Sequence, residues 1–503
     1  MNLSWQACNR ARLSRDARFD GKFFIGVVTT GIYCRPICPS RTAKDANVRY
    51  FPSAAAAEEG GFRPCLRCRP ECSPGTPAWL GTPSTVARAL RLIDENGLAN
   101  GGVESLAARL GVGSRHLRRL FLQHLGATPS AVAQTRRLHF AKKLIDETSL
   151  PMIQVALAAG FGSVRRFNAA FRKFYHRSPT QLRRLLPRRS ASLENEYLFR
   201  LHFRPPYHWR GMLHFLAGRA TPGVEAVDDR CYWRSISVDR HHGYFAVTCD
   251  SQANALLVRV QIGHPGLLFS IIGRIRSMFD LNADWPVIAK SLKGDPLLAP
   301  AVEAYPGLRV PGCWDGFELA VRTILERHVN LEAAAELAER VVKSFGTPLS
   351  PAAGKLTHLF PSPEVLAQAE LDGLELPVCA ADCIRSLAQA VCAAEIRFDG
   401  LVDCDALVSR LRRIRGISSS MAQYVAMRAL REPDAFPCDD PQLLRNAAGL
   451  AGRAEAWRPW GAYAAMYLWS YADAYEAGNT SAANMESPSL DSVPAGFLDA
   501  RHW

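Results

Sequence analysis

Two short stretches decide the first module of the fold: TTGIYCRPICPSR at residues 29–41 and GFRPCLRC at residues 61–68. They contain two close cysteine pairs that are 26 residues apart, formed by Cys34, Cys38, Cys65 and Cys68. Pairs with this spacing are typical of tetrahedral zinc sites, because each pair chelates from one turn and the chain closes around the ion. We therefore expect Zn²⁺ bound by all four thiolates. By spacing alone, such a site more often only holds a fold together than takes part in chemistry.

The residues around these cysteines resemble the N-terminal domain of the Ada family, bacterial regulators of the response to DNA alkylation, over roughly residues 4–72. The resemblance implies that Cys34 is both a zinc ligand and a nucleophile that takes a methyl group irreversibly from a methylated DNA phosphate. It also implies that Thr30, Arg41 and Arg63 contact the phosphate backbone. A zinc-bound thiolate is nucleophilic at neutral pH, whereas a free thiol with a pKa of about 8.5 is mostly protonated. Methylation also removes a negative charge next to the DNA, which favours phosphate binding.

The basic charge is concentrated in one part of the chain. Residues 84–189 hold 19 Lys/Arg against five Asp/Glu, whereas residues 190–503 hold 30 against 36. A concentrated basic block inside a folded segment favours a phosphate-binding surface, because a merely solvated face normally mixes both signs. Double-stranded DNA is therefore the expected partner.

Residues 84–186 have helical periodicity throughout and contain two related units. ESLAARLGVGSRHLRRLFLQHLG (104–126) and MIQVALAAGFGSVRRFNAAFRKFYHRSP (152–179) each place a glycine-containing turn between two helices. Apolar residues that keep helical phase are expected in the core of both units. They are Leu106, Leu110, Leu117, Leu120, Phe121, Ile153, Ala156, Phe161, Phe167 and Phe171.

These two units resemble the AraC-type DNA-binding domain, in which two recognition helices enter successive major grooves roughly 34 Å apart. The exposed starts of the second helices are then the candidate base-contacting segments, although a single Arg more often contacts a phosphate than a base. The candidates are Ser114, Arg115, Arg118, Ser163, Arg165 and Arg166. An all-helical interaction domain is the alternative, and it fits the basic charge poorly.

Residues 197–265 contain strand-like runs, and residues 316–470 return to helical spacing. Three stretches resemble the AlkA-type 3-methyladenine DNA glycosylases of the helix-hairpin-helix superfamily: LRVPGCWDGFELAVRTIL (308–325), MAQYVAMRALREPDAFPCDDPQLLR (421–445) and WRPWGAYAAMYLW (457–469). The resemblance implies a monofunctional glycosylase that hydrolyses the bond between deoxyribose and an alkylated base.

The same resemblance places the catalytic carboxylate on Asp440. An anion can stabilise the positive charge that develops on the sugar, and it can orient the attacking water. Asp followed by Pro is also a common helix start, with Asp as the cap. We expect both roles together, because a helix start can hold the carboxylate in place. Tyr424 and Trp469 fall at positions that line the base pocket and can stack a flipped base.

Four positions depart from the glycosylase pattern. The hairpin keeps Gly416 but has Ser418 in place of a second glycine. Ser420 stands where the family has an aromatic or lysine residue, and Arg327 and His328 replace the residues that wedge the duplex. Because of these departures, an alternative interpretation is a module that binds damaged DNA without efficient excision.

The sequence therefore predicts a multidomain, mainly α protein with α+β parts, in which an Ada-type regulator is fused to a glycosylase. The expected parts are a four-cysteine zinc methyl-acceptor domain (1–75), an all-α tandem helix-turn-helix domain (84–186), an α+β AlkA N-terminal domain (195–306), an all-α helix-hairpin-helix glycosylase domain (307–475) and a disordered tail (476–503). We expect a monomer in the bacterial cytoplasm, at the nucleoid, with no membrane contact and with RNA polymerase as a candidate partner. The alternatives are a regulator with a degenerate glycosylase and a zinc-stabilised transcription factor without methyl transfer.

Overall fold

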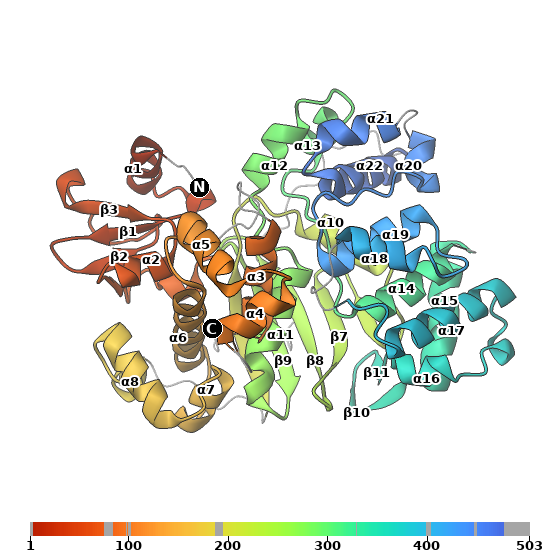
Figure 1. Cartoon of the computed structure of the whole chain (residues 1–503), viewed down its shortest axis with the longest axis horizontal. Helices are drawn as coiled ribbons and strands as arrows, with labels where there is room; N and C mark the ends of the chain where they lie inside the picture. The colour runs from red at the N-terminus through yellow and green to blue at the C-terminus, as the bar shows by residue number, and fades with distance from the viewer. Residues whose placement is uncertain are drawn as a thin grey trace.

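The computed structural model describes residues 4–74, 84–96, 98, 102–186, 195–327, 329–398, 404–446 and 450–476. A small sheet lies at one side of the molecule, with the helix-turn-helix units beside and below it. A larger sheet occupies the middle, and a helical half lies at the other side (Figure 1). The predicted fold class, multidomain and mainly helical with α+β parts, is confirmed. The stretches between the first three predicted domains (76–83 and 187–194) lie outside the described residues, as does the predicted tail from residue 477 on.

Residues 4–74, which we call the cysteine module, form a four-stranded sheet in the order β3-β1-β2-β4. Its only parallel neighbours within the described residues are β2 and β4. Apolar side chains fill two small clusters, one around Ile25 and one around Phe24, so the module has little core of its own. The elements are α1 (Trp5–Leu13), η1 (Ala17–Phe19), β1 (Phe24–Val27), β2 (Ile32–Cys34), η2 (Asp45–Asn47), β3 (Val48–Phe51), α2 (Ala54–Glu59), β4 (Arg63–Pro64) and η3 (Pro70–Cys72).

Residues 84–186 form the two predicted helix-turn-helix units, joined by the long helix α6. Gly111 and Gly160 make the turns with positive φ angles of 69° and 76°, which glycine adopts without steric cost. The second helices of the two units are α5 and α8. The elements are α3 (Ser84–Asn96), α4 (Gly102–Arg109), α5 (Ser114–Leu125), α6 (Pro129–Glu147), α7 (Met152–Ala158), α8 (Val164–Tyr175) and α9 (Pro179–Arg184).

Most of the predicted core residues of these units are buried, and Phe167 and Phe171 are fully so. The prediction for Ile153 is wrong, because this side chain is 61% exposed. Ile153 and Leu157 are four residues apart and share the outer face of α7, whereas Ala156 lies on the inner face. Helix α7 is apolar at most positions, so periodicity alone does not reveal its inner face.

The middle of the chain is a five-stranded antiparallel sheet in the order β5-β9-β8-β7-β6. Strands β5 and β9 alternate buried with partly exposed residues, as expected for strands with one face against a core. The elements are β5 (Glu196–His202), α10 (Trp209–Ala217), β6 (Glu225–Val227), β7 (Cys231–Val238), β8 (His241–Asp250), β9 (Ala255–Ile262), η4 (Pro265–Leu267) and α11 (Leu268–Met278).

The helical half is packed around α22, in which residues 461–469 are all buried. A two-stranded hairpin, which the sequence pattern does not reveal, interrupts the helices. The elements are α12 (Trp285–Leu292), α13 (Ala299–Ala304), α14 (Gly316–Glu326), α15 (Leu331–Phe345), β10 (Thr347–Ala353), β11 (Leu356–Leu359), α16 (Pro363–Ala367), η5 (Asp372–Leu374), α17 (Val378–Cys392), α18 (Cys404–Leu411), α19 (Ser419–Val425), the π-helical η6 (Ala426–Leu430), α20 (Pro441–Asn446), α21 (Leu450–Ala454), η7 (Glu455–Trp457) and α22 (Gly461–Glu476). Across the described ranges, we find no helix with the length and apolar character needed to cross a membrane.

The hydrophobic cores extend across the predicted domain boundaries. The first helix-turn-helix unit shares its core with Ala55 of the cysteine module, and the second unit shares one with the five-stranded sheet. Phe140 of α6 stacks on Phe199 of β5 with 6.4 Å between ring centroids. A second boundary is crossed at α12. Ile288 of this helix lies in the predicted domain 195–306, but its side chain belongs to the core of the helical half. Regulator-like and glycosylase-like parts are therefore packed into one continuous body.

The cysteine module packs on α6 through a buried polar group. The hydroxyl of Tyr33 donates to Oε1 of Glu58 at 2.7 Å and lies 2.9 Å from Nε2 of His139. The hydroxyl of Thr135 donates to Oε2 of Glu58 at 2.5 Å. Burial raises the pKa of Glu58 to about 8 and lowers the pKa of His139 to about 4. At neutral pH, both groups are therefore mainly uncharged.

The raised pKa of Glu58 predicts a pH dependence of stability. Its contribution is fully present below its ordinary pKa of 4.5 and is lost as the pH rises through about 8, because ionisation in the folded state is disfavoured. In the window between pH 4.5 and 8, the free energy of unfolding should fall by up to about 1.4 kcal/mol per pH unit from this group.

Urea unfolding of the wild type and the Glu58→Gln variant at pH 5.5, 7 and 8.5 measures this effect. The variant should have the weaker pH dependence over that range. Glu59→Gln, at the exposed neighbouring position, is the matched control and should behave like the wild type. Equal slopes for the wild type and Glu58→Gln would contradict the assignment.

Candidate functional sites

The two cysteine pairs meet because β2 and β4 run side by side. The register pairs Ile32 with Arg63, and the backbone N–H of Cys65 donates to the carbonyl of Tyr33 at 2.9 Å. Cys34 ends β2, and Cys65 directly follows β4. The four sulfur atoms of the predicted ligands, Cys34, Cys38, Cys65 and Cys68, all lie within 4.8 Å of one another.

The chemistry of this donor set fits a zinc ion. Zinc–sulfur bonds of about 2.3 Å place the sulfurs of a tetrahedral site about 3.8 Å apart, which is compatible with the observed cluster. Without a cation, the four thiols compete for protons. Hydrogen bonds with Cys38 and Cys65 raise the pKa of Cys34, whereas the hydrogen bond with Cys34 lowers the pKa of Cys65 to about 6. A divalent cation allows all four thiolates to be charged together.

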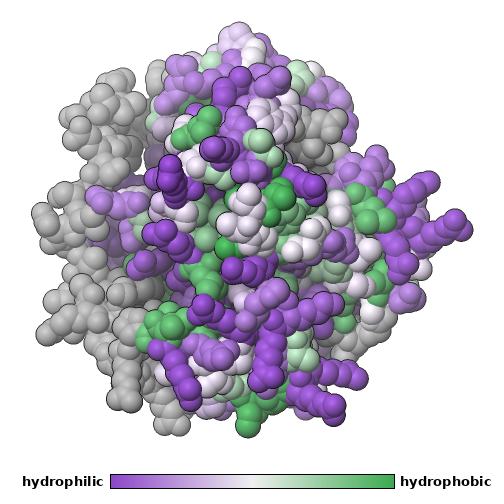
Figure 2. Space-filling view, turned by 90° about the vertical axis from the view of Figure 1, so that its left-hand side faces the viewer, coloured by the Kyte–Doolittle hydropathy of each residue, from purple (hydrophilic) through white to green (hydrophobic). Residues whose placement is uncertain are grey.

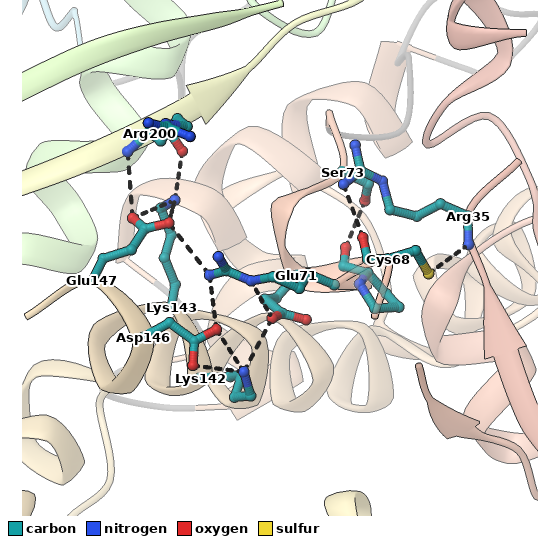
Figure 3. Close-up of polar contacts among 11 residues, drawn as sticks. Arg35, Cys68, Glu71, Ser73, Lys142, Lys143, Asp146, Glu147 and Arg200 are labelled. Carbon is teal, nitrogen blue, oxygen red and sulfur yellow. Dashed lines mark hydrogen bonds and ion pairs between the residues drawn. The ribbon is translucent and has the colours of Figure 1, made fainter. Parts of the chain in front are cut away.

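Arg35 supports the cluster from within the module, and the sequence analysis does not identify it. Its backbone N–H lies 3.4 Å from the sulfur of Cys68, and its guanidinium donates to the carbonyl of Cys68 at 3.1 Å (Figure 3). The same guanidinium forms a buried ion pair with Asp20. The only sequence signal for this role is that a charged residue directly follows a ligand cysteine. That signal does not distinguish a buried supporting residue from a residue that contacts DNA.

The three predicted phosphate contacts surround the cysteines. Thr30 is exposed in the turn between β1 and β2, and the backbone N–H of Arg63 donates to the carbonyl of Gly31 in the same turn at 2.8 Å. Arg41 is exposed on the segment that follows Cys38. Neither arginine forms an ion pair with the residues that the structure describes. Their role in phosphate contact stays a prediction.

The predicted base-contacting arginines, Arg115, Arg118, Arg165 and Arg166, are all exposed on α5 and α8. No carboxylate in the described part of the chain pairs with them. The hydroxyl of Ser163 accepts from the N–H of Arg166 at 3.2 Å and caps α8, so it has a structural role, and Ser114 starts α5 without capping it. The side of the molecule that carries the cysteine module and α8 is mainly hydrophilic (Figure 2). Base contact by these six residues stays a prediction.

Asp440 lies at the start of α20, and three N–H groups hold one of its oxygens. Oδ1 accepts from the backbone of Gln442 at 3.1 Å, from the backbone of Leu443 at 3.0 Å and from Nε1 of Trp469 at 3.2 Å. Among the described residues, Oδ2 receives no hydrogen bond. The carboxylate is partly exposed, so one oxygen fixes the side chain and the other remains open to a reactant.

The predicted pocket residues Tyr424 and Trp469 lie against each other, and Trp469 contacts Asp440. Their rings meet edge to face, with centroids 5.9 Å apart. The ring centroids of Phe215 on α10 and Trp469 are 6.3 Å apart. Buried Arg428 donates to the hydroxyl of Tyr424 at 2.8 Å. The sequence analysis does not identify Phe215 or Arg428 as part of this group. Arg428 follows Tyr424 by four residues, so helical spacing could have indicated their contact.

In the hairpin before α19, Gly416 and Ser418 have different structural roles. Gly416 has a φ of 104°, and a Cβ there would lie 3.2 Å from the sulfur of Cys383. The hydroxyl of Ser418 accepts from the N–H of Met421 at 3.2 Å, so the serine caps α19. Ser420 is partly exposed, with its hydroxyl 3.0 Å from that of Ser418.

Arg327 is exposed at the end of α14, and its Nη1 lies 3.9 Å from the sulfur of Met421. It therefore lies beside the first turn of α19. His328 lies outside the described residues, so only one of the two substituted wedge positions can be placed.

Three family models match the chain in the order of its modules. The metal binding domain of Ada matches residues 7–71, a helix-turn-helix domain matches residues 106–185, and the AlkA N-terminal domain matches residues 198–315. With the four-cysteine cluster, the first match identifies zinc as the metal of this site. Fold and sites thus define a modular protein that joins a zinc domain, a helix-turn-helix domain and an AlkA-type half.

Relatives match both the whole chain and its parts. The chain is 38% identical over 483 residues to the "Probable bifunctional transcriptional activator/DNA repair enzyme AlkA" of Mycobacterium tuberculosis, covering 93% of this chain and 97% of that protein. It therefore belongs to this family of bifunctional transcriptional activators and DNA repair enzymes. In Escherichia coli, "DNA-3-methyladenine glycosylase 2" is 31% identical over 54% of this chain and 96% of its own length. The E. coli "Bifunctional transcriptional activator/DNA repair enzyme Ada" is 38% identical over 26% of this chain and 35% of its own length.

Removal of zinc is predicted to unfold the cysteine module selectively. Its apolar clusters are small, and structural zinc in small domains contributes roughly 10–16 kcal/mol of apparent binding free energy at neutral pH. Hydrogen exchange before and after treatment with a strong chelator tests this prediction. Peptides from residues 20–70 should lose protection, whereas peptides from α22 should keep theirs. Retained protection throughout the module would contradict a folding role for the metal.

Proposed function

We propose that this protein senses DNA alkylation through Cys34, activates repair promoters through its helix-turn-helix units and excises alkylated bases with Asp440. The functional modules are residues 1–75, 84–186, 195–306 and 307–475. The observation that carries the proposal is that one chain holds both a four-thiol cluster and a carboxylate fixed by the indole of Trp469, which packs on Tyr424. The near full-length similarity to a bifunctional activator and repair enzyme supports the same function.

Methyl transfer to Cys34 is a direct displacement. The sulfur attacks the methyl carbon of a DNA methylphosphotriester, the carbon–oxygen bond breaks, and the phosphate oxygen leaves with the bonding electron pair as an ordinary diester. Bound zinc supplies a thiolate at neutral pH. Cys34 and Cys38 are partly exposed and can meet the backbone, whereas Cys65 and Cys68 are buried. Of the two exposed cysteines, Cys34 is chosen by its resemblance to the Ada family. Thr30, Arg41 and Arg63 then hold the flanking phosphates.

Operator binding is assigned to α5 and α8. Their exposed arginines have no acidic partner among the described residues and can meet phosphates and base edges of successive major grooves. Loss of one negative charge at the cysteine cluster raises affinity for the DNA backbone. We propose further that the protein acts as a monomer on chromosomal DNA in the cytoplasm, with RNA polymerase as its partner at promoters.

Base excision is assigned to Asp440. The glycosidic bond breaks as the alkylated base leaves with its electron pair, and the carboxylate stabilises the positive charge on the sugar. Water then adds to C1′ and gives its proton to the carboxylate. Tyr424 and Trp469 stack the flipped base, a contact worth roughly 1–3 kcal/mol per base.

Methyl uptake is tested by mass spectrometry after incubation with DNA that carries methylphosphotriesters. The peptide that contains Cys34 should gain one methyl group in the wild type and none in the Cys34→Ser variant. Cys379→Ser, which removes an exposed thiol in the helical half, should leave the uptake unchanged. A zinc-loaded wild type that gains no methyl group would favour the transcription factor without methyl transfer.

Asp440→Asn is predicted to lower the release of 3-methyladenine from methylated DNA by about 100- to 1,000-fold, the usual effect of losing one charge-stabilising group. The amide oxygen can still accept the three hydrogen bonds of Oδ1, so stability should change little. Asp440→Ala also removes the cap of α20 and should cost about 1 kcal/mol of stability in addition.

Chromatography of the released bases measures the first effect, and thermal unfolding measures the second. Asp439→Asn, at the exposed neighbouring position, is the control and should keep its activity. Undiminished release by Asp440→Asn would remove the catalytic assignment. A wild type that binds methylated DNA but releases no base would favour the degenerate glycosylase.

A further inference from the structure

Six charged side chains meet where the cysteine module packs on α6 (Figure 3). Five of them are at most 7% exposed, and Arg69 is 35% exposed. The cysteine module supplies Arg69 and Glu71. Helix α6 supplies Lys142, Lys143, Asp146 and Glu147.

Three ion pairs cross this boundary. Arg69 lies 2.7 Å from Asp146 and 3.5 Å from Glu147, and Lys142 lies 3.4 Å from Glu71. The same group reaches β5, where Lys143 donates to the carbonyl of Arg200 at 2.6 Å. The six residues therefore connect the cysteine module, the helix-turn-helix domain and the five-stranded sheet.

Each side of the boundary is also neutral by itself. On α6, Lys142 pairs with Asp146 at 2.5 Å, and Lys143 pairs with Glu147 at 2.7 Å. On the cysteine module, Arg69 lies 3.3 Å from Glu71. Breaking a buried ion pair is costly mainly when it leaves one charge without a partner. This boundary can open with every charge still paired, so its electrostatics favour a reversible contact over a permanent one.

The boundary is directly connected to the zinc ligands. Arg69 follows Cys68 in the chain and has a φ of 52°, a conformation that residues other than glycine rarely adopt. The guanidinium of Arg69 is held in place by three carboxylates, those of Glu71, Asp146 and Glu147. A movement of Cys68 therefore displaces Arg69 from its partners on α6.

The same loop touches the second helix-turn-helix unit. Leu66 packs against the core that this unit shares with the sheet, and β4 packs against α8. The position of the zinc-ligand loop therefore affects where α8 stands relative to the cysteine module.

We propose that the six charged residues form an ionic latch that couples the state of the cysteine cluster to the placement of α8. This inference rests on the proposed methyl transfer to Cys34. The closed latch fixes α8 beside the methyl-accepting surface, and opening it lets α8 and that surface meet DNA in a different relative position. A change at the cluster that moves Cys68 opens the latch without leaving an unpaired charge.

Hydrogen exchange on the zinc-loaded full chain tests the latch without relying on methyl transfer. Peptides from residues 66–74 and 139–148 should open together. Lys142→Met and Glu71→Gln should each speed exchange in both segments by at least about tenfold. Each removes the Lys142–Glu71 pair across the boundary and leaves the six-residue group with one uncompensated charge. The control is Lys343→Met, which breaks an exposed pair with Glu339 and should change neither segment.

Protection of residues 461–469 must stay at the wild-type level, which shows that each variant is folded. The double variant Glu71→Gln with Lys142→Met should open less than the product of the two single effects, because the two residues share one contact. Faster exchange only in the segment that carries the substitution would overturn the latch.

DNA binding then tests the coupling. Wild type, Lys142→Met and Lys343→Met are reacted with a duplex that carries methylphosphotriesters, and affinity for an unmodified duplex is measured before and after. All three should gain one methyl group on the Cys34 peptide, but Lys142→Met should lose most of the gain in affinity. A full gain in Lys142→Met would overturn the coupling. Absence of methyl uptake in all three would remove the proposed methyl transfer, and the exchange experiment would still decide whether the latch exists.

Discussion

The pairing of β2 with β4 brings four cysteine sulfurs within 4.8 Å of one another, and the N-terminal half of the molecule depends on this crowding. Thiolates at such distances repel one another, so the arrangement is stable only around a cation. The cysteine module has little apolar core to replace that ion. Its fold, its contact with α6 and the reactivity of Cys34 therefore share one physical origin. Arg35 adds a link that does not involve the metal, because it joins the Cys68 loop to buried Asp20.

Features encoded in short stretches of sequence could be predicted. The cysteine pairs chelate from local turns, and Gly111 and Gly160 mark turns that need a positive φ. The choice of buried face in α7 could not be predicted, because Ile153 and Ala156 are both apolar and only the neighbouring elements decide which one is buried. Arg35 was missed for a similar reason. Its partner Asp20 is 15 residues away, and no local pattern links the two.

The glycosylase half shows where a resemblance and a local rule agree. The sequence predicts that Asp440 both caps a helix and acts on the sugar, and the cap is present, with Trp469 as an additional donor. The catalytic role stays a prediction. Ser418 shows the converse case, because a departure from the family pattern has a clear local function as the cap of α19.

The stacking of Phe140 on Phe199 affects how the two parts of this chain can evolve. Two modules joined only by a linker can be lost, exchanged or separated without harm to either. Here the second helix-turn-helix unit and the sheet share a core, so separating the two parts into different proteins would place two apolar faces in water. A substitution that loosens the sheet also loosens the unit that carries α8. Selection therefore acts on the regulator and the repair enzyme together, because a substitution in their shared core changes the stability of both.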